Sequence, residues 1–179
     1  MATDTLKIGS KAPEFDLPAT DGNNYNIDTF KNKLLLIVIF SCNHCPYVQA
    51  YEERIKQIQN DLDDKLQIVA INSNEDVNYP EDSFDEMKKR AKERQFNFPY
   101  LRDETQKIAK AYGATHTPEI FMFNKNRELS FHGKIDDNWQ DTTSVKTQYL
   151  RNAINEILED KPISVPETFT IGCTIKWKR

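Results

Sequence analysis

The feature that most constrains the fold is an uninterrupted apolar run at residues 34–40, Leu-Leu-Leu-Ile-Val-Ile-Phe. Such a β-prone run without polar alternation is typical of a central strand covered on both faces. A helix is expected at about residues 45–62, because Pro46 suits a first helical turn and apolar side chains then recur at helical spacing. Those side chains are Tyr51, Ile55, Ile58 and Leu62. A buried strand that leads directly into a helix indicates an α/β fold with parallel strands.

The rest of the chain alternates strands and helices around this unit. Asp21-Gly22 is a strong turn signal between two short extended pieces and predicts a β-hairpin ahead of the main sheet. Further strands are expected at residues 66–71, 99–101, 120–123 and 129–134, and further helices at 84–94, 105–112 and 145–158. We predict an α/β domain with a central mixed sheet flanked by helices and an N-terminal β-hairpin extension. It spans residues 1–179, with a core at about 9–160 and a tail at 161–179.

The composition argues against nucleic-acid binding and against a membrane span. The 24 basic and 28 acidic side chains give a net charge of −4, without the clustered Lys and Arg typical of nucleic-acid binding. No apolar stretch approaches the roughly 18 residues that span a bilayer. Residues 1–12 lack a charged start followed by an apolar segment, so no secretory signal is expected and we predict a soluble, cytoplasmic protein. The basic end around Trp177 is expected to be a solvated terminus.

Cys42-Asn43-His44-Cys45 follows the buried strand and opens the helix. The unpaired N–H groups and the dipole of a helix N-terminus favour an anion, so a thiol there has a lowered pKa and a more available thiolate. The spacing lets the two sulfurs meet, and the pair can cycle between dithiol and disulfide. Two other interpretations are buried, inert thiols and a metal site completed by His116 or His132. A structural zinc site normally takes four ligands, and the chain has no second cysteine pair.

His44 lies between the two cysteines and would, when protonated, further favour thiolate. Stabilising the reduced form raises the reduction potential. We therefore expect a more oxidising pair than that of thioredoxins with Gly-Pro between their cysteines, with a midpoint above roughly −270 mV.

Several segments resemble one family. They are the opening segment at residues 9–17, the cysteine motif, Thr117-Pro118, the insertion at 72–98, and the ending Gly-Cys-Thr-Ile-Lys-Trp-Lys at 172–178. Together they resemble the thioredoxin superfamily, in its peroxiredoxin-like branch of the alkyl hydroperoxide reductase/thiol-specific antioxidant (redoxin) family. The resemblance covers nearly the whole chain and implies a thioredoxin-like fold and thiol-based redox chemistry.

The resemblance also implies roles for individual residues. Cys42 would be the attacking thiol and Cys45 the resolving one. Pro118 would be a cis-proline opposite them, which exposes the backbone beside Thr117 to an extended substrate that pairs in β-strand fashion.

The chain departs from the family pattern at two positions beside the motif. Ser41 stands where thioredoxins usually have Trp, and Leu36 where they have a buried acidic proton acceptor. Glu119 and His44 are candidates for handling the proton of Cys45, although Glu119 is expected to be a surface or loop carboxylate. The acidic stretch at residues 75–85 is either a loop that overhangs the active site or, as we expect, a solvated insertion.

Cys173, near the end of the chain, is either a small packing residue or a third redox thiol that relays or resolves a disulfide. Gly172 beside it permits a tight turn. His116 precedes Thr117 and is expected to border the site.

We predict a thiol–disulfide oxidoreductase that acts through Cys42 and Cys45, with no cofactor and no metal. Its partners would be a disulfide- or thiol-containing protein or small molecule and a thiol reductant system. Three alternatives stay open: a thiol-dependent peroxidase, a copper chaperone and a redox sensor. The peroxidase would act through Cys45, but it needs a nearby arginine, and none can be placed there. The candidate arginines are Arg54, Arg102 and Arg127. The copper chaperone would use the cysteine pair and His132, and the sensor would gate a partner through its dithiol state.

Overall fold

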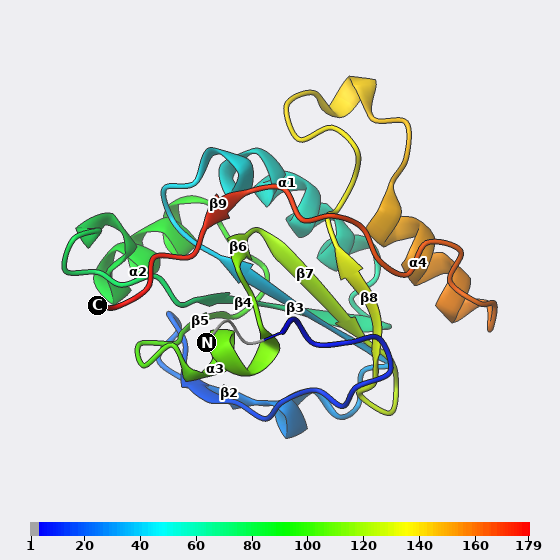
Figure 1. The fold of residues 1–179 in the computed structure, drawn as a ribbon, viewed down its shortest axis with the longest axis horizontal. Helices are drawn as coiled ribbons and strands as arrows, with labels where there is room; N and C mark the ends of the chain where they lie inside the picture. Colours follow the sequence, from blue (N-terminus) through cyan, green and yellow to red (C-terminus); the bar gives the residue numbers. More distant parts are fainter. Residues whose placement is uncertain (1–3) are drawn as a thin grey trace.

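A computed structural model describes residues 4–179 and has a five-stranded sheet at its centre (Figure 1). The strands lie in the order β5-β4-β3-β7-β8. Their bounds are β3 Leu35–Ser41, β4 Leu66–Asn72, β5 Tyr100–Arg102, β7 Glu119–Phe123 and β8 Leu129–Gly133. Strands β3, β4 and β5 run parallel, whereas β7 is antiparallel to both β3 and β8. The predicted mixed sheet is therefore confirmed.

Strand β3 is the central strand of the sheet, and every one of its residues is buried. Val38 pairs with Val69 of β4 on one side and with Phe121 of β7 on the other. Its alternate side chains enter two separate cores, Leu36 and Val38 on one face of the sheet and Ile37 and Ile39 on the other.

Helices cover both faces of the sheet. One core joins the odd-numbered residues of β3 to α1 Pro46–Asp61, α2 Phe84–Glu93 and α4 Tyr149–Leu158. The other core joins the even-numbered residues to α3 Lys107–Tyr112 and the N-terminal segment. That segment contains the predicted hairpin, β1 Asp16–Pro18 paired with β2 Asn24–Asn26, followed by the 3-10 turn η1 Ile27–Phe30.

Helix α4 begins at Tyr149 rather than near residue 145. The backbone before it is bonded to a neighbouring loop instead of continuing a helix. Asp137 N donates to Thr147 O at 3.2 Å, and Lys146 N donates to Asp137 Oδ1 at 3.0 Å. The 3-10 turn η3 Thr142–Ser144 precedes this segment.

The C-terminal tail runs back across the domain, and its strand passes beside β6 before the chain ends near α2 (Figure 1). Thr168 N donates to His132 O at 3.0 Å, which ties the tail to β8. The tail then forms β9 Cys173–Thr174, which pairs antiparallel with β6 His116–Thr117. Ile175 is buried in the second core, so only the side chains beyond it have the solvated character predicted for this end. Among residues 4–179, no helix is long and apolar enough to cross a membrane.

Candidate active site at the Cys42–Cys45 dithiol

Both cysteines of the motif lie where the central strand meets the first helix. Cys42 directly follows β3, and Cys45 is the N-cap residue of α1, with Pro46 in its first turn. Their exposed fractions are only 2% and 0%. A pair this deeply buried cannot be reached by a large substrate unless something moves.

Thr117 and Pro118 form the opposite wall of the site. The Thr117–Pro118 peptide bond is cis, as the resemblance led us to expect. Cys42 Sγ lies 3.4 Å from Thr117 Oγ1, and Cys45 Sγ lies 3.4 Å from Thr117 O. One residue of this wall therefore contacts both sulfurs.

Cys173 reaches the same place from the tail. It is the strand partner of Thr117 in the β6–β9 pair, and its side chain packs on the cluster of Cys42, Cys45 and Val48. The approach of the tail is close, because a Cβ added at Gly172 would lie 2.1 Å from Thr117 O. The structure thus brings three cysteines, rather than two, to one wall of the site.

The pKa values of the two motif thiols are shifted in opposite directions. The hydrogen bond from the Cys42 thiol, aided by Cys173 and working against burial, lowers the pKa of Cys45 to about 4. The same contact with Cys45, together with burial and the negative charge of Asp82, raises the pKa of Cys42. Within this pair the lowered pKa falls on Cys45, and the assignment of Cys42 as the attacking thiol stays a prediction.

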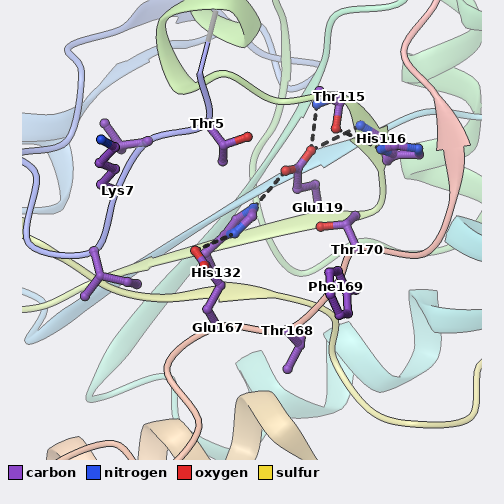
Figure 2. Close-up of a pocket in the computed structure, with 12 residues that line it drawn as sticks. Thr5, Lys7, Thr115, His116, Glu119, His132, Glu167, Thr168, Phe169 and Thr170 are labelled. Carbon is purple, nitrogen blue, oxygen red and sulfur yellow. Dashed lines mark hydrogen bonds and ion pairs between the residues drawn. The ribbon is translucent and has the colours of Figure 1, made fainter.

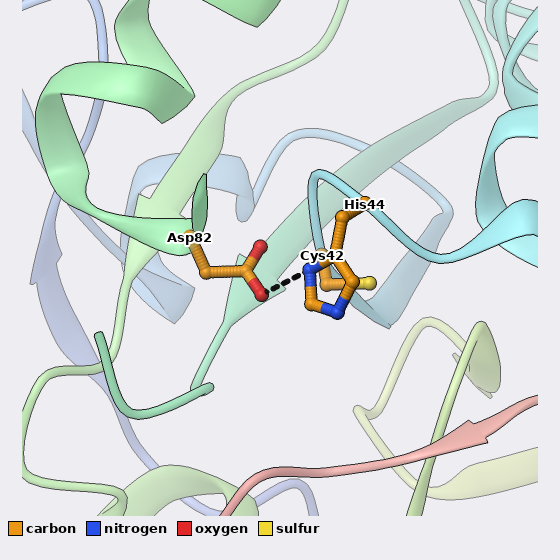
Figure 3. Close-up of side chains that lie close together, drawn as sticks. All are labelled: Cys42, His44 and Asp82. Atoms are coloured by element: carbon orange, nitrogen blue, oxygen red, sulfur yellow. Dashed lines mark ion pairs between the residues drawn. The ribbon is translucent and has the colours of Figure 1, made fainter. Parts of the chain in front are cut away.

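Asp82 is a site residue that sequence reasoning missed (Figure 3). It is fully buried in the 3-10 turn η2 Pro80–Asp82, and its Oδ2 lies 2.7 Å from His44 Nδ1. Its Oδ1 accepts a hydrogen bond from Asn43 N at 2.7 Å. The positive charge expected from protonated His44 is thus matched by a carboxylate beside the motif.

The interpretation of residues 75–85 as a solvated insertion is therefore wrong for part of that stretch. Asp82 is fully buried and Glu75 is 5% exposed. The signal lay in the preceding strand: Asn72-Ser73-Asn74 places buried polar side chains at the carboxyl end of β4, the edge where α/β sheets build their sites. Asn74 Nδ2 donates to Asp82 Oδ2 at 2.8 Å and Asn72 Nδ2 to Asp82 Oδ1 at 3.2 Å, so this edge holds the carboxylate in place.

Glu119 is also buried, with 1% of its surface exposed, and the expectation of a surface carboxylate is wrong. Its Oε2 accepts hydrogen bonds from Thr115 N and His116 N, and its Oε1 lies 2.8 Å from His132 Nε2 (Figure 2). The other ring nitrogen of His132 lies 3.3 Å from Glu167 Oε2. These residues line a cavity of about 780 Å³.

The metal interpretations find little support in the described residues. Cys42, His44 and Asp82 bring their ligand atoms within 4.8 Å of one another, but three donors fall short of the usual four of a structural zinc site. Both ring nitrogens of His132 are engaged by carboxylates. The copper interpretation therefore lacks its expected third ligand.

The three arginines considered for peroxide chemistry are all engaged elsewhere. Arg54 Nη1 pairs with Asp136 Oδ2 at 2.8 Å. Arg102 donates to Asn74 O at 2.8 Å, and Arg127 donates to Phe30 O at 2.8 Å. Within residues 4–179, the hydrogen bonds and ion pairs of these arginines include neither sulfur of the motif.

A family model described as Redoxin matches residues 7–149. The chain belongs to the redoxin family. This redoxin is similar, at 37% identity and a TM-score of 0.91, to an uncharacterized conserved protein from Geobacillus kaustophilus, with 98% of this chain and 94% of that chain covered. A hypothetical protein from Sinorhizobium meliloti is 34% identical, with a TM-score of 0.91 and coverage of 98% and 97%.

A more distant structure is the peroxidoxin BcpB from Mycobacterium tuberculosis. Its identity is 16% and its TM-score 0.59, with 70% of this chain and 86% of that chain covered. A likeness at this level shows the thioredoxin-like fold alone. No curated protein matches the chain.

Proposed function

We propose that this redoxin is a thiol–disulfide oxidoreductase whose Cys42 and Cys45 cycle between dithiol and disulfide. The observation that carries the proposal is the contact of both sulfurs with Thr117, each at 3.4 Å, at the N-terminus of α1. Membership of the redoxin family supports thioredoxin-like redox chemistry at this place.

Within the pair, Cys45 is the proposed nucleophile and Cys42 its partner. The lowered pKa of Cys45 supports this order, because the thiolate is the species that attacks a disulfide. Attack on a substrate disulfide forms a mixed disulfide at Cys45 and releases one substrate thiol. Cys42 then loses its proton and attacks Cys45 Sγ, which leaves a Cys42–Cys45 disulfide and the second substrate thiol.

The substrate would be a disulfide- or thiol-containing protein or small molecule, and a cellular thiol system would return the pair to its starting state. The reverse of the same steps oxidises substrate thiols, and the potential of the pair decides the direction.

The proposal is tested by titrating the reduced protein with oxidised glutathione and mapping disulfides by mass spectrometry after alkylation. We expect a Cys42–Cys45 disulfide in the wild type and its absence in Cys42→Ser and Cys45→Ser. Insulin reduction by the reduced wild type, and by neither variant, is the expected activity. Failure to form the Cys42–Cys45 bond would refute the proposal.

A thiol peroxidase acting through Cys45 is the second candidate, because its lowered pKa favours the thiolate that attacks peroxide. Against it stands the engagement of Arg54, Arg102 and Arg127 elsewhere. Mixing the reduced protein with hydrogen peroxide separates the two candidates. Thiol loss no faster than that of free cysteine would refute a peroxidase function.

A further inference from the structure

The C-terminal tail occupies the place beside Thr117 where an extended substrate would pair. Strand β9 pairs antiparallel with β6, and Cys173 stands opposite Thr117 in that pairing. Extended peptides are recognised through main-chain hydrogen bonds at such an exposed strand edge. The tail therefore takes the position of a substrate strand, with a cysteine at the register position nearest the dithiol.

The three cysteines differ in access. Cys42 and Cys45 are 2% and 0% exposed, whereas Cys173 is partly exposed. An external thiol or disulfide in solution therefore meets Cys173 before it meets either sulfur of the motif.

Contacts connect Cys173 to one member of the pair in particular. Its side chain packs on the cluster of Cys42, Cys45 and Val48, and of the two motif thiols it is Cys45 whose pKa the proximity of Cys173 lowers. Burial against this cluster raises the pKa of Cys173 to about 11. Cys173 is thus a poor first nucleophile toward a molecule in solution but a close neighbour of Cys45.

We infer that Cys173 is a third redox-active thiol, which carries the disulfide from the buried pair to the surface through a Cys45–Cys173 bond. The inference rests on the proposed cycling of Cys42 and Cys45. The partner at the surface is a thiol, either a small molecule or a cysteine of a protein.

The exchange balances in two stages. Cys173 attacks Cys45 Sγ of the Cys42–Cys45 disulfide, the Cys45–Cys173 bond forms, and Cys42 leaves and takes up the proton that Cys173 gave up. An external thiolate then attacks Cys173 Sγ, and Cys45 leaves as a thiolate. A second external thiol reduces the mixed disulfide at Cys173, so that two external thiols become one external disulfide.

The second of these stages is favoured by its leaving group, whereas the first depends on the packing of Cys173 against the dithiol. A thiol of low pKa leaves a disulfide faster, and Cys45 is the low-pKa thiol of the site. Attack on the accessible sulfur, Cys173, therefore expels the better leaving group, whereas an external thiol has no comparable access to the Cys42–Cys45 bond.

The test uses full-length variants. In Cys42→Ser, mild oxidation with oxidised glutathione is expected to give a Cys45–Cys173 disulfide, identified by mass spectrometry. In Cys45→Ser, the corresponding Cys42–Cys173 bond is expected in much smaller yield. Absence of the Cys45–Cys173 bond would refute the inference, and a wild-type Cys42–Cys45 disulfide in the same experiment would leave the proposed function standing.

A kinetic measurement distinguishes a disulfide relay through Cys173 from simple shielding of the dithiol by the tail. The oxidised wild type and Cys173→Ser are reduced with glutathione, with Thr174→Ser on the same strand as the matched control. A relay predicts reduction at least about tenfold slower in Cys173→Ser, with the midpoint potential of the pair little changed. If the tail only shields the pair, loosening it speeds reduction, and an equal or faster rate in Cys173→Ser overturns the relay.

Discussion

At the scale of single residues, Asp82 places a buried carboxylate beside the dithiol motif. After the contact with Cys45 and burial, its negative charge is a further cause of the raised pKa of Cys42, and its Oδ2 lies 2.7 Å from His44 Nδ1. A negative charge beside the motif disfavours thiolate, and so it disfavours the reduced form. It therefore opposes the oxidising bias that His44 predicts.

We expect Asp82→Asn to raise the reduction potential by about 30 mV, which corresponds to roughly 1.4 kcal/mol for a two-electron couple. The amide oxygen can still accept from Asn43 N, so the backbone contact is kept. Redox titration against glutathione measures the change. Asp85→Asn is the control, since its side chain is 87% exposed, and an unchanged or lower potential in Asp82→Asn would contradict the argument.

The lowered pKa of Cys45 predicts a thiolate in the reduced protein well below neutral pH. Thiolate absorbance in the ultraviolet is expected to titrate with a midpoint near the pKa of about 4, and this transition is expected to disappear in Cys45→Ser. If instead the low-pH transition disappears in Cys42→Ser while Cys45→Ser keeps it, Cys42 holds the thiolate.

The same pKa predicts how stability depends on pH. A cysteine in the unfolded chain has a pKa of about 8.5, so between about pH 4 and 8.5 the unfolded chain binds the proton that folded Cys45 has lost. Stability of the reduced protein therefore rises with pH across this window, relative to Cys45→Ser. Urea unfolding of both proteins at several pH values checks the sign.

At the scale of elements, β9 is held against β6 by a close approach that only a glycine allows. A Cβ at Gly172 would lie 2.1 Å from Thr117 O and 2.7 Å from the Thr117 carbonyl carbon. Both are backbone atoms, so rotation of a side chain cannot relieve the clash.

We expect Gly172→Ala to displace β9 and to open the site. Overpacking of this kind costs roughly 1–3 kcal/mol, enough to raise the population of open molecules by about 5-fold to 150-fold. The rate at which iodoacetamide alkylates Cys42 and Cys45 is expected to rise accordingly. Ile171→Ala is the neighbouring control, since Ile171 is 45% exposed, and alkylation at the wild-type rate in Gly172→Ala would show that β9 does not limit access.

At the scale of the whole molecule, the tail belongs to the core as well as to the site. Ile175 is 3% exposed and packs in the core that contains Phe40, Tyr112 and Phe121. The backbone around it is also bonded, since Glu75 N donates to Lys176 O at 2.9 Å and Lys178 N donates to Gln106 Oε1 at 2.9 Å. A change in the core is thereby coupled to the position of β9, which lies over the dithiol.

Ile175→Ala is expected to lower the free energy of unfolding by about 2 kcal/mol, toward the lower end for buried isoleucines because a terminal segment can open locally. The same variant is expected to expose the dithiol to alkylation. Urea unfolding and alkylation rates measure the two effects, with Ile171→Ala again as the surface control. Loss of stability without faster alkylation would show that the packing of Ile175 in the core does not control access to the dithiol.

Local patterns were enough to predict the frame of the site. The apolar run at residues 34–40, Pro46 and the helical spacing after it depend on neighbours along the chain. They placed the dithiol at the start of a helix after a buried strand, and the resemblance added the cis-proline opposite it.

What only the tertiary structure decided is the environment of the two sulfurs. Asp82 reaches the motif from a turn 39 positions after Asn43, Glu119 is buried by its contact with His132, and Cys173 arrives with a tail that pairs with β6. The burial of an acidic side chain, and the strand edge that a tail selects, depend on groups distant in sequence whose contacts form only when the chain has folded. For that reason the chain by itself determined where the dithiol lies, whereas folding decided which groups surround each sulfur and which of the three cysteines faces solvent.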